Sequence, residues 1–181
     1  MEKCRMVFSG SGGQGVITAA IILAESAVLY EDLVAVQSQV YGAEARGGAT
    51  RSDVIISDSE IYFPKVTQPN VLVSLTQEAY NKFYTIVRPG GLLLTDTHYV
   101  KTWKKADARQ KKLPMYQTVM DKIGKPVVFN ICMLGAVIAL TNVVKPESVL
   151  KSLESRIPPA FLQMNRESFK IGLEMGSEFG G

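Results

Sequence analysis

Apolar residues along the chain form two alternating patterns, which predict strands and helices in turn. Short continuous apolar runs bounded by glycine, proline or polar residues are typical of buried strands. Five such runs occur, at residues 4–8, 33–36, 71–75, 92–95 and 127–129.

Longer segments between these runs repeat apolar residues three or four positions apart, which is typical of a helix with one buried face. In residues 14–29 the repeat consists of Ile17, Ile21, Ala24 and Val28, and it predicts that this face is buried. Further helices are predicted at residues 76–87, 114–123, 131–143, 146–157 and 165–175. Asn130 is the predicted N-cap of the helix at 131–143, which is apolar nearly all round and therefore predicted to be buried.

One part of the chain has the pattern of a hairpin. Residues 52–58 and 60–64 are predicted strands joined around Asp58 and Ser59, which adds an antiparallel edge to the sheet. Strands that alternate with helices indicate a layered α/β fold. We therefore expect one Rossmann-like three-layer domain over residues 1–181, with a mixed, mostly parallel sheet.

A glycine-rich turn separates the first strand from the first helix. Gly10, Gly12 and Gly15 match the G-x-G-x-x-G spacing, with Gly13 and Gln14 between them. Glycines leave backbone N–H groups uncovered, and these groups favour an anion at the start of a helix. The five residues are therefore a candidate phosphate-binding or partner-binding site. A turn that only packs the helix closely on the sheet explains the glycines equally well.

The second predicted strand, at residues 33–36, is followed by Gln37, Ser38 and Gln39. Dinucleotide-binding enzymes normally place an acidic residue here, where it holds the ribose hydroxyls. Its absence counts against ordinary NAD binding.

Residues 41–51 predict a structured loop of unusual length, and long loops are often functional. Its candidate partner-interface residues are Tyr41, Gly42, Glu44, Arg46, Gly47, Gly48 and Arg51. Arginine can bind a carboxylate or phosphate through two donors. In the alternative interpretation, Glu44 pairs with an arginine and only orders the loop.

A basic run occupies residues 101–112 and includes Lys104 and Lys105. Most such runs are solvated surfaces, but this one could also contact a phosphate or an acidic partner. Lys104 and Lys105 are therefore candidate cofactor-binding residues.

Composition excludes several classes of function. The net charge of +3 over 181 residues is too small to indicate nucleic-acid binding, and no apolar run is long enough to span a membrane. The first strand follows Met1 almost directly, so we expect no signal peptide and a cytoplasmic protein. Cys4 and Cys132 are the only cysteines, and His98 is the only histidine. We therefore expect no metal site, no disulfide framework and no catalytic residue on this chain.

Two motifs together carry a family resemblance. Residues 10–16 read G-S-G-G-Q-G-V, and residues 41–48 read Y-G-A-E-A-R-G-G. This pair resembles the gamma subunit of 2-oxoacid:ferredoxin oxidoreductases, most closely the 2-oxoglutarate type. The sequence departs from the family pattern at Val40 and Ala43, where serine and proline are expected.

The resemblance implies a subunit without a redox cofactor of its own. In such complexes, alpha and beta subunits bind thiamine diphosphate and a ferredoxin-like subunit carries iron–sulfur clusters. The complex oxidatively decarboxylates a 2-oxoacid, transfers the acyl group to coenzyme A and reduces ferredoxin. The glycine turn and the basic run then become candidate contacts for coenzyme A. Two other interpretations stay open: a free-standing nucleotide- or NAD-binding oxidoreductase, and a non-catalytic assembly module.

Overall fold

A computed structural model describes residues 3–40, 48–103 and 105–179, and these form a six-stranded mixed sheet with helices on both faces. The strands are β1 (Cys4–Gly10), β2 (Val34–Val40), β3 (Thr50–Ser57), β4 (Val71–Ser74), β5 (Gly91–Asp96) and β6 (Ala108–Leu113). Their order across the sheet is β2-β3-β1-β4-β5-β6. β3 pairs antiparallel with both β1 and β2, whereas β1, β4, β5 and β6 pair in parallel. The expected three-layer α/β fold with a mostly parallel sheet is confirmed.

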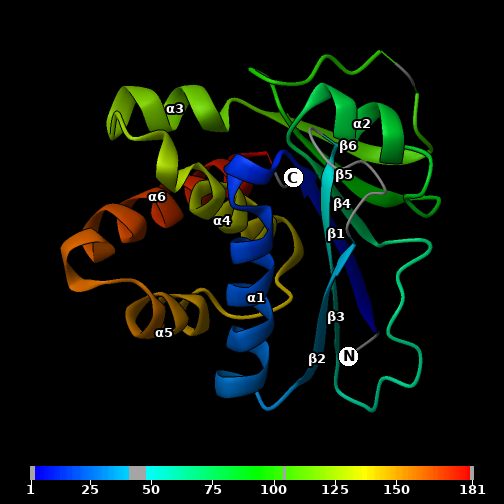
Figure 1. Ribbon diagram of the computed structural model, residues 1–181, viewed down its shortest axis with the longest axis horizontal. Coiled ribbons are helices and arrows are strands. Elements are labelled where there is room, and N and C mark those ends of the chain that lie inside the picture. Colours follow the sequence, from blue (N-terminus) through cyan, green and yellow to red (C-terminus); the bar gives the residue numbers. More distant parts are fainter. Residues whose placement is uncertain (1–2, 41–47, 104, 180–181) are drawn as a thin grey trace.

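Six α-helices and two short 3₁₀ turns complete the described part of the chain. They are η1 (Gly12–Gln14), α1 (Val16–Tyr30), α2 (Gln77–Phe83), α3 (Met115–Lys122), η2 (Pro126–Val128), α4 (Phe129–Thr141), α5 (Pro146–Arg156) and α6 (Pro159–Glu178). Figure 1 shows α1 and α3 to α6 on one side of the sheet and α2 on the other. The two sides are therefore covered unequally.

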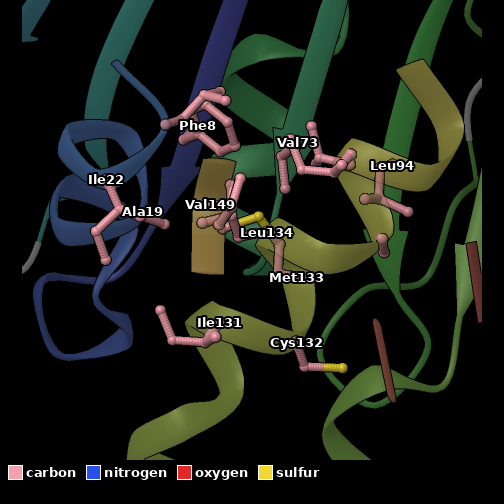
Figure 2. Packing of buried hydrophobic residues seen from close by; sticks show 14 of the residues in the cluster. Phe8, Ala19, Ile22, Val73, Leu94, Ile131, Cys132, Met133, Leu134 and Val149 are labelled. Carbon is pink, nitrogen blue, oxygen red and sulfur yellow. The ribbon is translucent and has the colours of Figure 1, made fainter. Parts of the chain in front are cut away.

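The larger core lies between the sheet and α4. Helix α4 has buried residues at ten successive positions, as its nearly uniform apolar sequence predicts. Figure 2 shows Phe8 of β1, Ala19 and Ile22 of α1 and Leu134 of α4 around this core. A smaller core between α2 and the sheet includes the fully buried Tyr80 of α2.

Helices α4 and α6 approach each other closely because glycines face the contact. A Cβ atom added at Gly172 would clash with the backbone carbonyl of Cys132, and one at Gly176 would lie 2.7 Å from the carbonyl oxygen of Ala136. Gly135 of α4 would clash in the same way with the backbone of α6 at Phe169. These glycines allow the two backbones to touch where any side chain would hold them apart.

Several predicted elements are wrong. The residues predicted as a hairpin at 52–58 and 60–64 do not pair, because 52–57 belong to β3, which pairs instead with β1 and β2, and 60–64 form no strand. The predicted strand at 127–129 is the end of η2 and the first residue of α4. Short apolar runs do not distinguish a strand from a buried helix segment, and here the helix prevails.

Other boundaries shift for local reasons. Part of the basic run is an edge strand, β6, and α6 begins at Pro159 rather than at 165. Proline suits the first turn of a helix because its missing N–H is not needed there. The predicted buried stripe on α1 (Ile17, Ile21, Ala24 and Val28) is only half-buried, and Val28 is 48% exposed.

Candidate functional site

The glycine turn joins β1 to α1 at the carboxyl end of the parallel strands. Gly15 adopts a left-handed conformation, with φ of 71°, immediately before α1. A Cβ atom at Gly15 would lie 2.5 Å from the Asn130 Nδ2 atom. Both observations require glycine at this position. Ligands of open α/β sheets bind at this end of the strands.

The side chain of Gln14 lies inside the turn. Its Oε1 accepts a hydrogen bond from the Ser11 N–H at 2.9 Å, and its Nε2 donates to the Leu75 carbonyl at 3.0 Å. A Cβ at Gly10 would clash with the Gln14 carboxamide. Gln14 therefore ties the turn after β1 to the chain that leaves β4, and one backbone donor of the turn is already satisfied.

Asn130 connects the same turn to α4. Its Nδ2 donates to the Gly15 carbonyl at 3.1 Å. Asn130 was the predicted N-cap of this helix, but it lies within the first turn of α4, whose N-cap is Val128. The amide side chain therefore holds the start of α1 against the start of α4 instead of capping its own helix.

A cavity of about 390 Å³ opens beside the turn, between the starts of α1, α4 and α6. Its polar lining includes Gln14, Thr18 and Asn130. Val127 and Phe161 also line it and are 73% and 54% exposed. Gly13 borders the cavity and has no atom within 4 Å of its Cβ position. The cavity can therefore hold a mainly apolar group next to the exposed glycine turn at a helix start.

The other predicted site residues are not gathered around this cavity. Tyr41, Gly42, Glu44, Arg46, Gly47 and Lys104 lie outside the described residues. Gly48 is half-buried just before β3. Lys105 is exposed. It lies two residues before Asp107, whose carbonyl accepts a hydrogen bond from the Gly90 N–H just before the start of β5. Lys105 and the glycine turn therefore lie at opposite ends of the parallel strands.

Arg51 was predicted as a loop residue, but it lies in β3 and its side chain is 14% exposed. Its Nε and one terminal nitrogen contact the two carboxylate oxygens of Asp53 at 2.6 and 2.9 Å. The same terminal nitrogen donates to the Val66 carbonyl at 2.6 Å, and the guanidinium lies 5.5 Å from the centre of the Phe83 ring. These contacts give Arg51 a structural role within the chain.

Sequence reasoning missed a cluster at the carboxyl end of β5. The buried Asp96 accepts hydrogen bonds from the backbone N–H groups of His98 and Tyr116, both at 2.8 Å. Burial raises the pKa of the Asp96 carboxyl, while these hydrogen bonds oppose the increase. The His98 ring stacks on Tyr116 with centroids 4.5 Å apart. Asp96 directly follows the predicted strand at 92–95, and this position was the available signal, since the carboxyl ends of the strands are where functional side chains of open α/β sheets gather.

Cys132 does not resemble a reactive thiol. Cys132 is buried in α4, and burial, followed by the influence of Asp96, raises the pKa of its thiol to about 12. Reactive thiols instead have a lowered pKa in a partly exposed site. Residues 3–40, 48–103 and 105–179 contain no group of three or more histidine, cysteine or acidic side chains placed to hold a metal ion. In the same residues no helix combines the length and apolar character needed to cross a membrane.

The sheet topology also disfavours dinucleotide binding. In the dinucleotide-binding fold, β1 lies beside a second parallel strand whose end contacts the ribose. Here the antiparallel β3 lies between β1 and β2. Gln37, Ser38 and Gln39 lie within β2 and not beyond its end, so this prediction of the strand boundary was wrong. The free-standing NAD-binding interpretation is not favoured.

Comparisons with known proteins agree with the resemblance. The family model for pyruvate ferredoxin/flavodoxin oxidoreductase matches residues 5–175. The 2-oxoglutarate synthase subunit KorC of Methanocaldococcus jannaschii is 44% identical over 172 residues, which cover 94% of this chain and 92% of that protein.

Solved structures share the fold. The gamma subunit of a keto/oxoacid ferredoxin oxidoreductase from Geobacter sulfurreducens is 40% identical, with a TM-score of 0.89 and 97% coverage of both chains. A 2-oxoglutarate:ferredoxin oxidoreductase from Magnetococcus marinus is 20% identical, with a TM-score of 0.87, and supports the fold alone. The match covers 98% of this chain but only 32% of that protein chain. The chain belongs to the pyruvate ferredoxin/flavodoxin oxidoreductase family.

Proposed function

We propose that this chain is the gamma-type subunit of an oxidoreductase that acts on 2-oxoglutarate. The complex would decarboxylate the 2-oxoacid oxidatively, transfer the acyl group to coenzyme A and pass two electrons to ferredoxin. The observation that carries the proposal is 44% identity to a 2-oxoglutarate synthase subunit over nearly the full length of both chains. A shared fold alone would not support a shared function.

The cofactors would then belong to other subunits. A four-thiolate iron–sulfur cluster needs four cysteines, whereas this chain has two, one in β1 and one buried in α4. The partners would be thiamine-binding alpha and beta subunits and a ferredoxin-like subunit. The expected cytoplasmic location is part of the same proposal.

Within such a complex, the glycine turn and its cavity are the best candidate on this chain for a contact with coenzyme A. The turn exposes Ser11, Gly12 and Gly13 at the start of a helix, which favours a phosphate group. The neighbouring cavity is mainly apolar and suits an uncharged part of the same molecule. Lys104 and Lys105 would have to bind a separate part of the ligand or another partner, because Lys105 lies at the other end of the strands.

Gly13→Asp tests this contact. Gly13 borders the cavity in open space, so the added side chain should not disturb the fold. A carboxylate there would repel a phosphate. In the assembled complex we expect an increase of roughly fivefold in KM for coenzyme A, since one unfavourable charge contact costs on the order of 1 kcal/mol. KM for the 2-oxoacid should stay the same. Steady-state kinetics of complexes carrying Gly13→Asp or the uncharged Gly13→Ala measure both values, and equal KM values for coenzyme A would remove the turn from the site.

Co-purification from cells tests the subunit assignment. The tagged chain should bring down thiamine-binding subunits, and the recovered complex should reduce ferredoxin with 2-oxoglutarate and coenzyme A. A chain recovered alone, or an active complex that uses only another 2-oxoacid, would contradict the proposal. Mass spectrometry of the partners and assays with several 2-oxoacids separate these outcomes.

The loop at 41–51 supplies a specific prediction for this experiment. We propose that the loop contacts a thiamine-binding subunit, with Arg46 as an anchor, because arginine is enriched among residues that dominate binding energy. Arg46→Glu should leave the melting temperature unchanged and weaken co-purification by roughly thirtyfold, which corresponds to about 2 kcal/mol. Lys65→Glu, an exposed charge reversal elsewhere, is the matched control. If Arg46→Glu lowers the melting temperature and the complex forms normally, Arg46 orders its own loop through Glu44 instead.

A further inference from the structure

The basic run at residues 101–112 dominates the charge balance of the chain. It contains six basic residues and one acidic residue, a net charge of +5, whereas the whole chain has a net charge of +3. The rest of the chain is therefore slightly acidic. Lys101, Lys105, Arg109 and Lys112 are exposed, and in the part of the chain that the structure describes none of them belongs to an ion pair.

Much of the run lies on the side of the sheet that α2 covers. Val100 and Ala106 pack in the smaller core between α2 and the sheet, so the segment between them crosses that side. Ala108 of β6 packs against the same core, and alternate residues of a strand share a face, so Lys112 also lies on this side. The exposed lysines on the α2 side of the sheet are therefore Lys101, Lys105 and Lys112.

Two amide side chains of α2 hold residues 101–103 in place. Gln77 accepts a hydrogen bond from the Lys101 N–H at 2.7 Å and donates one to the Lys101 carbonyl at 3.2 Å. One turn further along α2, Asn81 accepts a hydrogen bond from the Trp103 indole N–H at 3.0 Å. Gln77 also donates to Asn81 at 3.1 Å, so the two amides are linked. Together they fix the backbone at Lys101 and the direction of the Trp103 indole.

Trp103 is the only tryptophan of the chain, and it is 63% exposed although its indole is held by Asn81. Tryptophan is enriched among the residues that dominate binding energy at protein interfaces. A side chain that is already fixed before binding loses less conformational freedom when a partner arrives. The hydrogen bonds from α2 therefore prepare Trp103 to contact a partner.

We propose that Lys101, Trp103, Lys105 and Lys112 form a docking surface for an acidic surface of another protein. We call it the Trp103 surface. Trp103 is its anchor, and the lysines around it pair with carboxylates of the partner. Charge complementarity of this kind selects the partner and speeds its association. The inference does not rest on the proposed function, because the partner is defined by its acidic surface alone.

Other occupants fit the Trp103 surface less well. A second copy of the chain would bring like charges together, which is costly at an interface. Lysines around an exposed tryptophan are also found where proteins bind single-stranded nucleic acid. Here, however, the chain outside residues 101–112 is slightly acidic and offers no continuous positive path for a phosphate backbone. A protein with a compact acidic surface is the better match.

Zero-length cross-linking of the complex purified from cells tests the proposal. A carbodiimide joins a lysine amine to a carboxylate in direct contact with it. We expect amide links from Lys101, Lys105 or Lys112 to aspartate or glutamate residues of another protein, and mass spectrometry identifies both ends. Links from these lysines only to a second copy, or no links from them to any other protein, overturn the proposal.

Variants of the full chain test the anchor and the charges separately. Trp103→Ala, and the double variant Lys101→Glu with Lys105→Glu, should each weaken co-purification of the cross-linked partner by about tenfold or more. Lys170→Glu in α6, whose side chain is 76% exposed, is the matched control and should co-purify as the wild type does. Thermal melts establish that each variant is folded. A complex that Trp103→Ala and the double variant both leave intact contradicts the proposal.

Tryptophan fluorescence distinguishes a nucleic acid from a protein partner. Because Trp103 is the only tryptophan, its emission reports directly on this surface. We expect no change when the purified chain is titrated with oligothymidylate at micromolar concentrations. Quenching that disappears in the Lys101→Glu, Lys105→Glu variant would overturn the proposal and assign the Trp103 surface to single-stranded nucleic acid.

Discussion

Gly172→Ala is expected to unfold or strongly destabilise the protein, although alanine is the better helix former by about 1 kcal/mol. The added Cβ would clash with the backbone carbonyl of Cys132, and a backbone carbonyl within α4 cannot rotate away. Helices α4 and α6 would have to separate, which would loosen the largest helix contact of the core. Overpacking a core costs about 1–3 kcal/mol and occasionally more, and we expect a value near 3 kcal/mol.

Thermal denaturation measures this effect. For a chain of this size, about 3 kcal/mol corresponds to a fall in Tm of roughly 6–12 °C. Gly13→Ala is the control, because its Cβ position has no atom within 4 Å, and we expect a change within about 0.5 kcal/mol. If Gly172→Ala melts at the wild-type temperature, the α4–α6 contact is looser than this geometry indicates.

The glycines of α6 illustrate what sequence can and cannot predict. The apolar pattern of residues 131–143 correctly predicted a helix buried all round. That pattern does not show which other helix contacts it. From the sequence alone, Gly172 is predicted only to destabilise its own helix, because glycine has a low helix propensity. Only the packing of α6 on α4 turns this residue into a requirement.

The sheet was predicted better in its strands than in its pairing. Four of the five apolar runs fall in strands of the structure, but the position of β3 between β1 and β2 was not expected. The antiparallel pairing of β3 with β2 was missed because residues 52–58 were predicted to pair with residues 60–64 instead. Strand order depends on contacts between distant residues, whereas periodicity reports only local burial.

The position of the glycine turn was predicted correctly, but only part of what holds the turn in place was predicted. Gly15 needs its left-handed conformation, as the fingerprint requires. Gln14 and Asn130 had no signal of their own in the spacing, and both turned out to hold the turn through side-chain amides. Such bonds join residues 61 and 115 positions apart, which no local pattern could reveal.

Removing one partner of the Arg51–Asp53 pair is expected to destabilise the isolated chain as strongly as the glycine substitution. The side chains are 14% and 6% exposed, so Asp53→Ala leaves a guanidinium with little access to water. Breaking a buried ion pair from one side costs about 3–5 kcal/mol, because the remaining charge stays desolvated. Arg51→Met should cost about as much, since it also removes the donor to the Val66 carbonyl.

The double variant Arg51→Met with Asp53→Leu separates the structural role from a partner contact. With both charges absent, the sum of the single effects should overestimate the loss by at least about 1 kcal/mol, which is the usual size of coupling between residues in direct contact. Urea denaturation of the four proteins provides this cycle. If Arg51 instead served mainly to bind another subunit, each single variant would melt normally and co-purification alone would fail. Additive losses would show that the two side chains act independently, in spite of two hydrogen bonds between them.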